Sequence, residues 1–143
     1  MKIRLLTLAF LMAASWPAFA DPIADRQAAM KNFSSISRQL NAYVRGQQPF
    51  DAAAVKTALE AFDSGVKAFD VDALFPAGTE TGGGTEASPR IWEDRDAFKA
   101  AAAKFAGDVA GALAAAPQDA ETLAPLFGTI SSNCSACHRE WRT

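Results

Sequence analysis

Apolar residues recur every three or four positions along most of the chain, which is the spacing of one face of an α-helix. The first series follows Asp21 and Pro22, which favour a helix start, and stops near Gly46, which favours a helix end. It predicts a helix from about 22 to about 45. The face contains one charged residue among apolar ones: Ile23, Arg26, Met30, Phe33, Leu40 and Val44.

Two further segments show the same period. The second helix is predicted to follow the capping residue Asp51, with apolar positions Val55, Leu59, Phe62, Val66 and Phe69. The third is predicted to begin at Ser88-Pro89, as cap and first helical position, and to end at Pro117. Its apolar face is Ile91, Phe98, Ala102, Phe105, Val109 and Leu113.

The last segment carries its apolar series to the end of the chain: Leu123, Leu126 or Phe127, Ile130, Cys134, Cys137 and Trp141. Pro125 predicts either a kink in this helix or a helix start at Ala124-Pro125. Residues 73–88 lack the period and contain T-E-T-G-G-G-T-E, which predicts a mobile loop. Four amphipathic helices with otherwise short connections predict an all-α fold, an antiparallel up-down-up-down four-helix bundle.

The first twenty residues have the features of a secretory signal peptide. Lys2 and Arg4 precede an apolar run at 5–14, and Ala18-Phe19-Ala20 is a typical cleavage site. This run is too short to span a bilayer and no later one is long enough, so we expect no membrane span. The sequence therefore predicts a signal peptide at 1–20, one mature domain at 21–143 and a periplasmic location.

Charge excludes some classes of function. Removal of residues 1–20 takes away Lys2 and Arg4, so the formal net charge falls from −2 to −4. Such a mildly acidic chain has no basic stripe for nucleic acid. The carboxylates form no pair that suggests acid–base catalysis, so we expect no enzyme activity.

The chain has two cysteines and one histidine, and all three lie within C-S-A-C-H at 134–138. On a helix, Cys134, Cys137 and His138 are neighbours at i, i+3 and i+4. Thioether bonds from the two sulfurs to a haem leave the imidazole facing the iron, and this pentapeptide is the attachment signature of haem c. The motif therefore predicts one covalent haem c.

Two other chemistries of cysteine fit less well. A tetrahedral zinc site needs four ligands, and this chain offers three at most. Thiol–disulfide exchange favours a cysteine pair at a helix start in a βαβ setting, whereas this pair lies in the last turns of a helix. A disulfide between Cys134 and Cys137 would close a very small loop and stabilise little.

Three stretches together resemble the class II cytochromes c, the family of cytochrome c′ and its low-spin relatives. They are R-Q-A-A-M-K at 26–31, I-W-E-D-R-D-A-F-K at 91–99 and C-S-A-C-H-R-E-W-R at 134–142. The resemblance implies that Cys134 and Cys137 hold the haem, that His138 is the proximal ligand and that Arg142 lies close to it.

The sixth position of the iron is open on the sequence alone. With one histidine, bis-histidine ligation is impossible, and Met30 is the only methionine left after residues 1–20 are removed. In low-spin members of the family the matching methionine binds the iron, whereas in five-coordinate members the residue there only shields the sixth position. Met30 is the predicted distal ligand, with core packing as the alternative.

Three more side chains are predicted near the haem. Arg26 lies on the apolar face one turn before Met30, where a haem propionate is the expected partner of its guanidinium. Trp92 and Trp141 are the aromatic residues expected first in the haem wall, although most such residues pack in the core.

Two functions remain open. The first is a one-electron carrier that serves periplasmic redox partner proteins. The second is a five-coordinate protein that binds nitric oxide or carbon monoxide on the Met30 side. The family resemblance also allows a homodimer through the first two helices.

Overall fold

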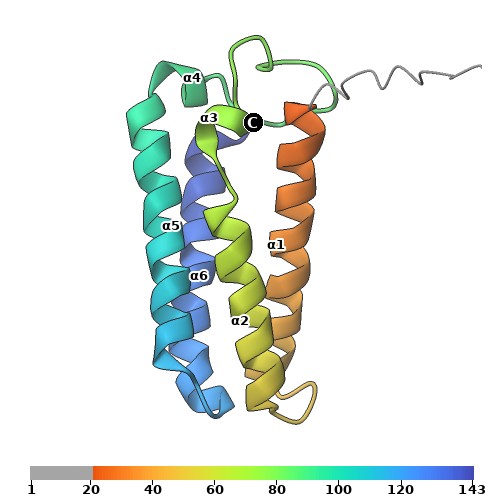
Figure 1. The fold of residues 1–143 in the computed structure, drawn as a ribbon, viewed down its shortest axis with the longest axis vertical. Helices are drawn as coiled ribbons and strands as arrows, with labels where there is room; N and C mark the ends of the chain where they lie inside the picture. Colours follow the sequence, from red (N-terminus) through yellow and green to blue (C-terminus); the bar gives the residue numbers. More distant parts are fainter. Residues whose placement is uncertain (1–20) are drawn as a thin grey trace, which may run out of the picture.

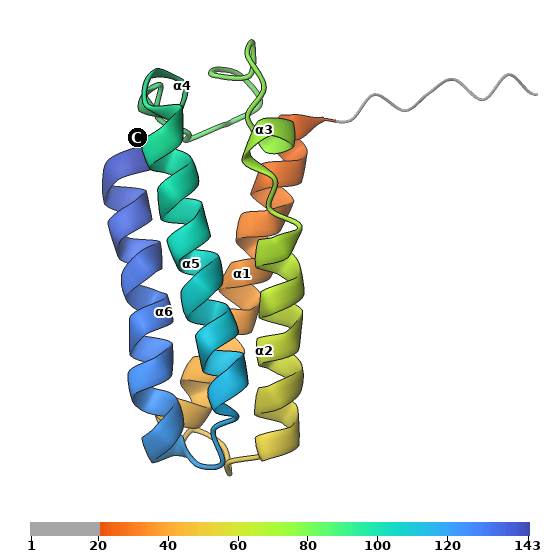
Figure 2. The same ribbon diagram turned by 60° about the vertical axis from the view of Figure 1, so that its left-hand side comes forward.

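The computed structural model describes residues 21–143, so the predicted signal peptide lies outside the described residues. Four long helices form the antiparallel up-down-up-down bundle that the sequence predicts (Figures 1 and 2). They are α1 (Pro22–Val44), α2 (Ala52–Lys67), α5 (Arg95–Ala115) and α6 (Ala120–Trp141). Two short helices, α3 (Val71–Leu74) and α4 (Arg90–Glu93), lie in the connection between α2 and α5.

The long helices contact one another in the cyclic order α1, α2, α5, α6 and back to α1. The contact between α1 and α6 is the least extensive of these four. No helix within residues 21–143 is long and apolar enough to cross a membrane.

The third predicted helix is not continuous. The chain leaves helical geometry at Asp94, with φ −127° and ψ 63°, so that α4 ends there and α5 starts at the next residue. The Asp94 carboxylate accepts a hydrogen bond from the backbone N–H of Ala97, at 3.4 Å. An aspartate that bonds to its own downstream backbone competes with helix continuation, and the periodicity of apolar residues does not reveal this competition.

The last helix begins earlier than Ala124-Pro125, so that predicted start is wrong. It begins at Ala120, after Asp119, whose carboxylate accepts from the backbone N–H of Thr122 at 2.8 Å in a capping box. Pro125 lies inside the helix. The cap satisfies the first free N–H groups, and proline then removes a single backbone hydrogen bond, to the carbonyl of Glu121.

Buried apolar side chains form two separate clusters. The larger one joins all four long helices and includes the fully buried Leu40, Leu59, Phe62 and Ile130. The smaller one lies where α3, α4, α5 and the end of α6 meet, and consists of Val71, Phe75, Ile91, Phe98 and Trp141. The half-buried Phe69 packs against both clusters.

Helices α1 and α2 approach each other closely at Gly65. A Cβ atom at this position would lie 2.9 Å from Cε1 of Phe33. The Phe33 ring is itself fixed, because it stacks on Phe62 at 5.6 Å and meets Phe105 edge-on at 5.5 Å, measured between ring centroids. Glycine is therefore required here by packing, at some cost in helix propensity.

We expect Gly65→Ala to lower the free energy of unfolding by about 1 kcal/mol in urea denaturation. Overpacking of a fixed ring costs about 1–3 kcal/mol, which outweighs the gain of about 1 kcal/mol in helix propensity. Gly111→Ala in α5 is the matched control, because no atom lies within 4 Å of its Cβ position. It should raise stability by about 0.5–1 kcal/mol. Equal stabilisation by both substitutions would contradict the packing argument.

Candidate functional site

A cavity of about 1000 Å³ lies inside the bundle. We call it the central cavity. Its walls contain members of both apolar clusters, and its apolar lining includes Phe33, Phe69, Phe75, Ile91, Phe98, Phe105 and Trp141. The cavity therefore borders both clusters, and six aromatic rings are among its lining side chains.

Helix α6 presents both cysteines and the histidine of the C-S-A-C-H motif to this cavity. Cys134, Cys137 and His138 all line it; the cysteines are half-buried and His138 is exposed. The Cys134 thiol lies 3.6 Å from the carbonyl oxygen of Ile130, one turn earlier in the same helix. The spacing i, i+3, i+4 thus brings two sulfurs and one imidazole to one cavity wall.

Burial shapes the protonation of these groups. It raises the pKa of both thiols, and the charge of Cys134 raises that of Cys137 further. Few thiolates therefore form near neutral pH, which disfavours thiol–disulfide exchange. The imidazole ring of His138 is partly shielded from water although the residue as a whole is exposed; this desolvation lowers the pKa of His138, Arg142 lowers it further and Glu86 acts in the opposite sense. The imidazole is therefore neutral near pH 7, with a nitrogen lone pair free to bind a metal.

The zinc interpretation finds no support in the described part of the chain. No group of three or more His, Cys, Asp or Glu side chains within residues 21–143 is gathered closely enough to hold a metal ion. The two thiols and the imidazole line one cavity without converging on a single point. Such an arrangement suits a large planar ligand better than one tetrahedral ion.

Met30 lines the same cavity from α1. Its side chain is 38% exposed, and within residues 21–143 it is the one large apolar side chain that is exposed to solvent. The sequence places it on the apolar face of the helix, but that face points to the central cavity at this position and not into the packed core. Ligation of an iron by Met30 or His138 stays a prediction.

Arg26 is buried, at 4% exposure, and its guanidinium anchors the segment that follows α3. Nη1 donates to the carbonyl oxygen of Leu74 at 3.2 Å and to Oγ1 of Thr79 at 3.0 Å. Nη2 donates to the carbonyl oxygen of Thr79 and to Oγ1 of Thr85, both at 2.6 Å. The guanidinium also lies 5.0 Å from the ring centroid of Phe75. Arg26 lines the central cavity as well, and its contact with a propionate stays a prediction.

Residues 79–88, which we call the strap, are held at both ends. On the α1 side, Gln27 donates to the carbonyl of Gly83 at 3.0 Å. On the α6 side, Ala87 forms an antiparallel bridge with Arg142, and the N–H of Thr143 donates to the carbonyl of Glu86 at 2.9 Å. The sequence suggested a mobile loop; the structure shows a segment tied to the two helices that carry Met30 and His138.

The remaining predicted site residues lie at different distances from the cavity. Arg142 lines it and forms an ion pair with Glu86, another lining residue. Trp141 also lines it. Trp92 is not among the lining residues: its ring packs on Phe75, at 5.9 Å between ring centroids, and its Nε1 donates to the carbonyl of Pro76 at 3.2 Å.

Sequence reasoning missed several polar residues of the site. Thr79, Thr85 and Glu86 lie in the segment that composition marks only as loop, and no spacing rule pairs them with Arg26 or Arg142. Asn133 is buried beside Cys134 and donates to the Asp108 carboxylate at 2.7 Å, which fixes α6 against α5. The one sequence signal for Asn133 is that a polar residue stands beside the apolar positions of this helix.

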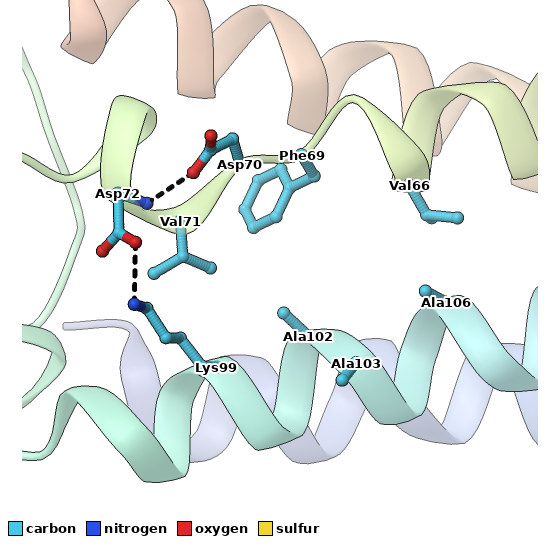
Figure 3. Close-up of a pocket in the computed structure, with 9 residues that line it drawn as sticks. All are labelled: Val66, Phe69, Asp70, Val71, Asp72, Lys99, Ala102, Ala103 and Ala106. Atoms are coloured by element: carbon cyan, nitrogen blue, oxygen red, sulfur yellow. Dashed lines mark hydrogen bonds and ion pairs between the residues drawn. The ribbon is translucent and has the colours of Figure 1, made fainter.

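A second, smaller pocket of about 360 Å³ lies between the end of α2, α3 and α5 (Figure 3). Phe69 and Ala102 line both this pocket and the central cavity, so they form the wall between the two. Lys99 donates to the Asp72 carboxylate at 2.7 Å beside the pocket. The pocket brings together no set of side chains with evident chemistry.

The residues of the central cavity fit a haem. Ligand cavities reach about 1000 Å³ and are mostly apolar with a few placed polar groups, and the central cavity has these properties. Two thiols and a neutral imidazole lie on one wall, the thioether of Met30 lies on α1, and Arg26 and Arg142 add guanidinium groups to the lining. The donor set matches covalent attachment and axial ligation of one haem c.

Comparison with known proteins agrees with this fit. The family model described as Cytochrome C' matches residues 21–142. Cytochrome c-556 of Agrobacterium fabrum is 37% identical over 99% of this chain and 97% of its own length. Cytochrome c' of Rhodopseudomonas palustris is 36% identical over 99% of this chain and 97% of its own.

Solved structures show the same fold. The structure of cytochrome c' from Rhodopseudomonas palustris aligns over 87% of this chain and 97% of the cytochrome chain, with a TM-score of 0.80 and 35% sequence identity. A nitric oxide complex of a mutant of cytochrome c prime from Alcaligenes xylosoxidans aligns over 87% of this chain and 98% of the cytochrome chain, with a TM-score of 0.76 and 33% sequence identity.

The anchoring of the strap can be tested with Thr85→Val. This change removes the hydroxyl that accepts from the buried Nη2 of Arg26, and an unsatisfied buried donor costs about 1–3 kcal/mol. We expect a loss of this size in urea denaturation, together with faster hydrogen–deuterium exchange at residues 79–88. Thr57→Val is the matched control, because its exposed hydroxyl bonds only within α2. Identical exchange in the two variants would contradict the anchoring role.

Proposed function

Because this chain belongs to the class II cytochrome c family, whose members bind one covalently attached c-type haem, we propose that it is a periplasmic one-electron carrier. One observation carries the proposal: Cys134, Cys137 and His138 of α6 line the same apolar cavity as Met30 of α1. A c-type haem attached to α6 would therefore have a possible ligand on each side.

Each residue has a distinct task in this proposal. Cys134 and Cys137 would form the two thioether bonds, His138 would be the proximal ligand and Met30 the distal ligand. When bound, the haem supplies an iron that gains and loses one electron. The aromatic walls of the cavity exclude water, and together with the sulfur of Met30 they favour the reduced form.

Arg26 would hold the acidic edge of the haem, and Arg142 would lie beside the proximal ligand. Arg26 uses its four Nη–H groups on the strap and Leu74, so its Nε–H is the donor left for a propionate. Arg142 is oriented by Glu86 beside His138. Trp141 lines the cavity and would contact the haem, whereas Trp92 packs on Phe75 and would support that ring from behind.

The protein turns over no substrate in this proposal. Members of the family are typically non-enzymatic haem proteins. The partners are periplasmic redox proteins, reached after the predicted removal of residues 1–20. The family also includes proteins that form dimers, and a homodimer through α1 and α2 is compatible with this function.

A second candidate function is gas binding. One similar solved structure is described as a nitric oxide complex, and it is 33% identical to this chain. Met30 is 38% exposed at the cavity, so its side chain has room to move. If its sulfur does not bind the iron, nitric oxide or carbon monoxide would be taken on that side.

Met30→Leu separates the two functions. In an electron carrier with methionine ligation, the ferric protein is low-spin with a band from iron–sulfur bonding. The substitution should abolish that band, give a high-spin spectrum and lower the reduction potential, because axial ligands tune haem potentials over about 0.8 V.

Ser37→Ala is the matched control, since Ser37 lines the same cavity from the same helix and offers no iron ligand in this proposal. It should leave spectrum and potential unchanged. A wild-type protein that is already high-spin, that binds nitric oxide readily and that Met30→Leu does not alter would favour the gas-binding function.

A further inference from the structure

Charged residues are unevenly distributed between the helices. All 16 carboxylates of the chain lie outside residues 26–45 and outside residues 122–139. These two stretches form most of α1 and α6, which contact each other along one side of the bundle. We call this side the α1–α6 face. Its exposed basic residues are Lys31, Arg38, Arg45 and Arg139, and the buried Arg26 also belongs to these stretches.

Three of these basic residues form a row. Lys31, Arg38 and Arg45 follow one another at intervals of seven, so they lie on one side of the helix over a length of about 21 Å. All three are exposed, and none forms an ion pair with a residue in 21–143. Arg38 donates only to Oγ of Ser34 on its own helix, at 2.8 Å. Their charges are therefore not neutralised locally.

The lysines of the other two long helices differ in this respect. Lys56 and Lys67 on α2 lie 3.5 Å and 2.6 Å from carboxylates one turn away on the same helix. On α5, Lys104 pairs with Asp108, and Lys99 pairs with Asp72 beside the small pocket of Figure 3. Near neutral pH these lysines add little net positive charge to their surroundings.

The central cavity opens on the basic side. Its exposed lining residues all come from α1, from residues 84–86 and from 135–142 at the end of the chain, and they include Lys31 and Arg38. The lining residues of α5 and the α2–α3 connection are buried or half-buried. A haem held by α6 would thus be reached from solvent beside Lys31 and Arg38, two members of the row, while the exposed Glu86 on the same rim is paired with Arg142.

We propose that the α1–α6 face is the docking surface for an acidic redox partner. The inference rests on the proposed electron-carrier function. An unpaired basic row beside the cavity mouth attracts an acidic surface to the point where the haem is closest to solvent, and the acidic remainder of the chain repels that surface elsewhere. The row sets association rate and orientation.

Two other occupants of this face are less favourable. A second copy would place one basic row against another if the contact were symmetric, which costs free energy. An anionic membrane would attract the row, but stable attachment takes a denser basic cluster or an apolar insertion. Within residues 26–45 and 122–139, Met30 is the single large apolar side chain that is exposed to solvent.

The electrostatic effect of the basic row can be tested on the haem-loaded protein with two small electron acceptors of opposite charge. We expect the double variant Lys31→Gln with Arg38→Gln to be oxidised from its ferrous form roughly two- to tenfold more slowly by the anion hexacyanoferrate(III) at low ionic strength. The same variant should be oxidised faster by the cation tris(phenanthroline)cobalt(III), because the positive charges that repel this cation are gone. Both effects should vanish at about 0.5 M salt, where the Debye length falls below about 5 Å. Lys56→Gln with Lys67→Gln, an equal charge change on α2, should alter neither rate appreciably. Equal effects of the two double variants would overturn the proposal.

Docking of an acidic polypeptide is tested with a polyglutamate peptide. In NMR titration of the haem-loaded protein, amide shifts should change around Lys31, Arg38 and Arg139, and the α1 double variant should lose them. Changes centred on α2 and α5 would overturn the proposal. A protein that ignores the peptide but cosediments with phosphatidylglycerol vesicles, and loses this binding in the α1 double variant, would also overturn the proposal. Dimerisation that the α1 double variant abolishes would overturn it as well.

These measurements are independent of the identity of the sixth ligand. Failure of Met30→Leu to change the spectrum would refute methionine ligation. The oxidation rates of the Lys31→Gln, Arg38→Gln variant would still test the docking surface. An absence of charge dependence in a protein with confirmed methionine ligation would refute the docking surface alone.

Discussion

Three side chains within five residues of α6 have to reach one cavity, and the rest of the bundle is arranged around that requirement. A helix can present Cys134, Cys137 and His138 together only if their common side faces inward along its last turns. The apolar interior accordingly forms two clusters, and both of them border the central cavity. Asn133, bonded to Asp108, and the capping box at Asp119 fix the helix that carries the motif.

The strap gives the cavity a second constraint. It joins α1, through Arg26 and Gln27, to the end of α6, through the bridge between Ala87 and Arg142. Met30 lies one turn after Arg26, and His138 lies one turn before Arg142. The spacing of the two predicted ligands therefore depends on a loop that forms neither of them, and a buried guanidinium is what holds this loop in place.

Much of the fold was predictable, because the spacing of apolar residues within one helix can be read from a short stretch of sequence. The series through Leu59, Phe62 and Val66 specifies which side of α2 is buried, and those residues are buried. Errors arose where polar backbone chemistry decides: Asp94 interrupts the third helix, and Asp119 starts the fourth one ahead of Pro125. The cavity wall of α6 was predictable from C-S-A-C-H, whereas the Arg26 contacts join residues more than 45 positions apart and leave no local pattern.

The central claim is covalent attachment of one haem through Cys134 and Cys137, and intact-mass spectrometry of the exported protein tests it most directly. The account predicts a chain starting at Asp21 whose mass is increased by one haem, with both thiols resistant to alkylation after denaturation. A chain of unmodified mass with two alkylatable thiols, recovered from a host that matures c-type cytochromes, would contradict it.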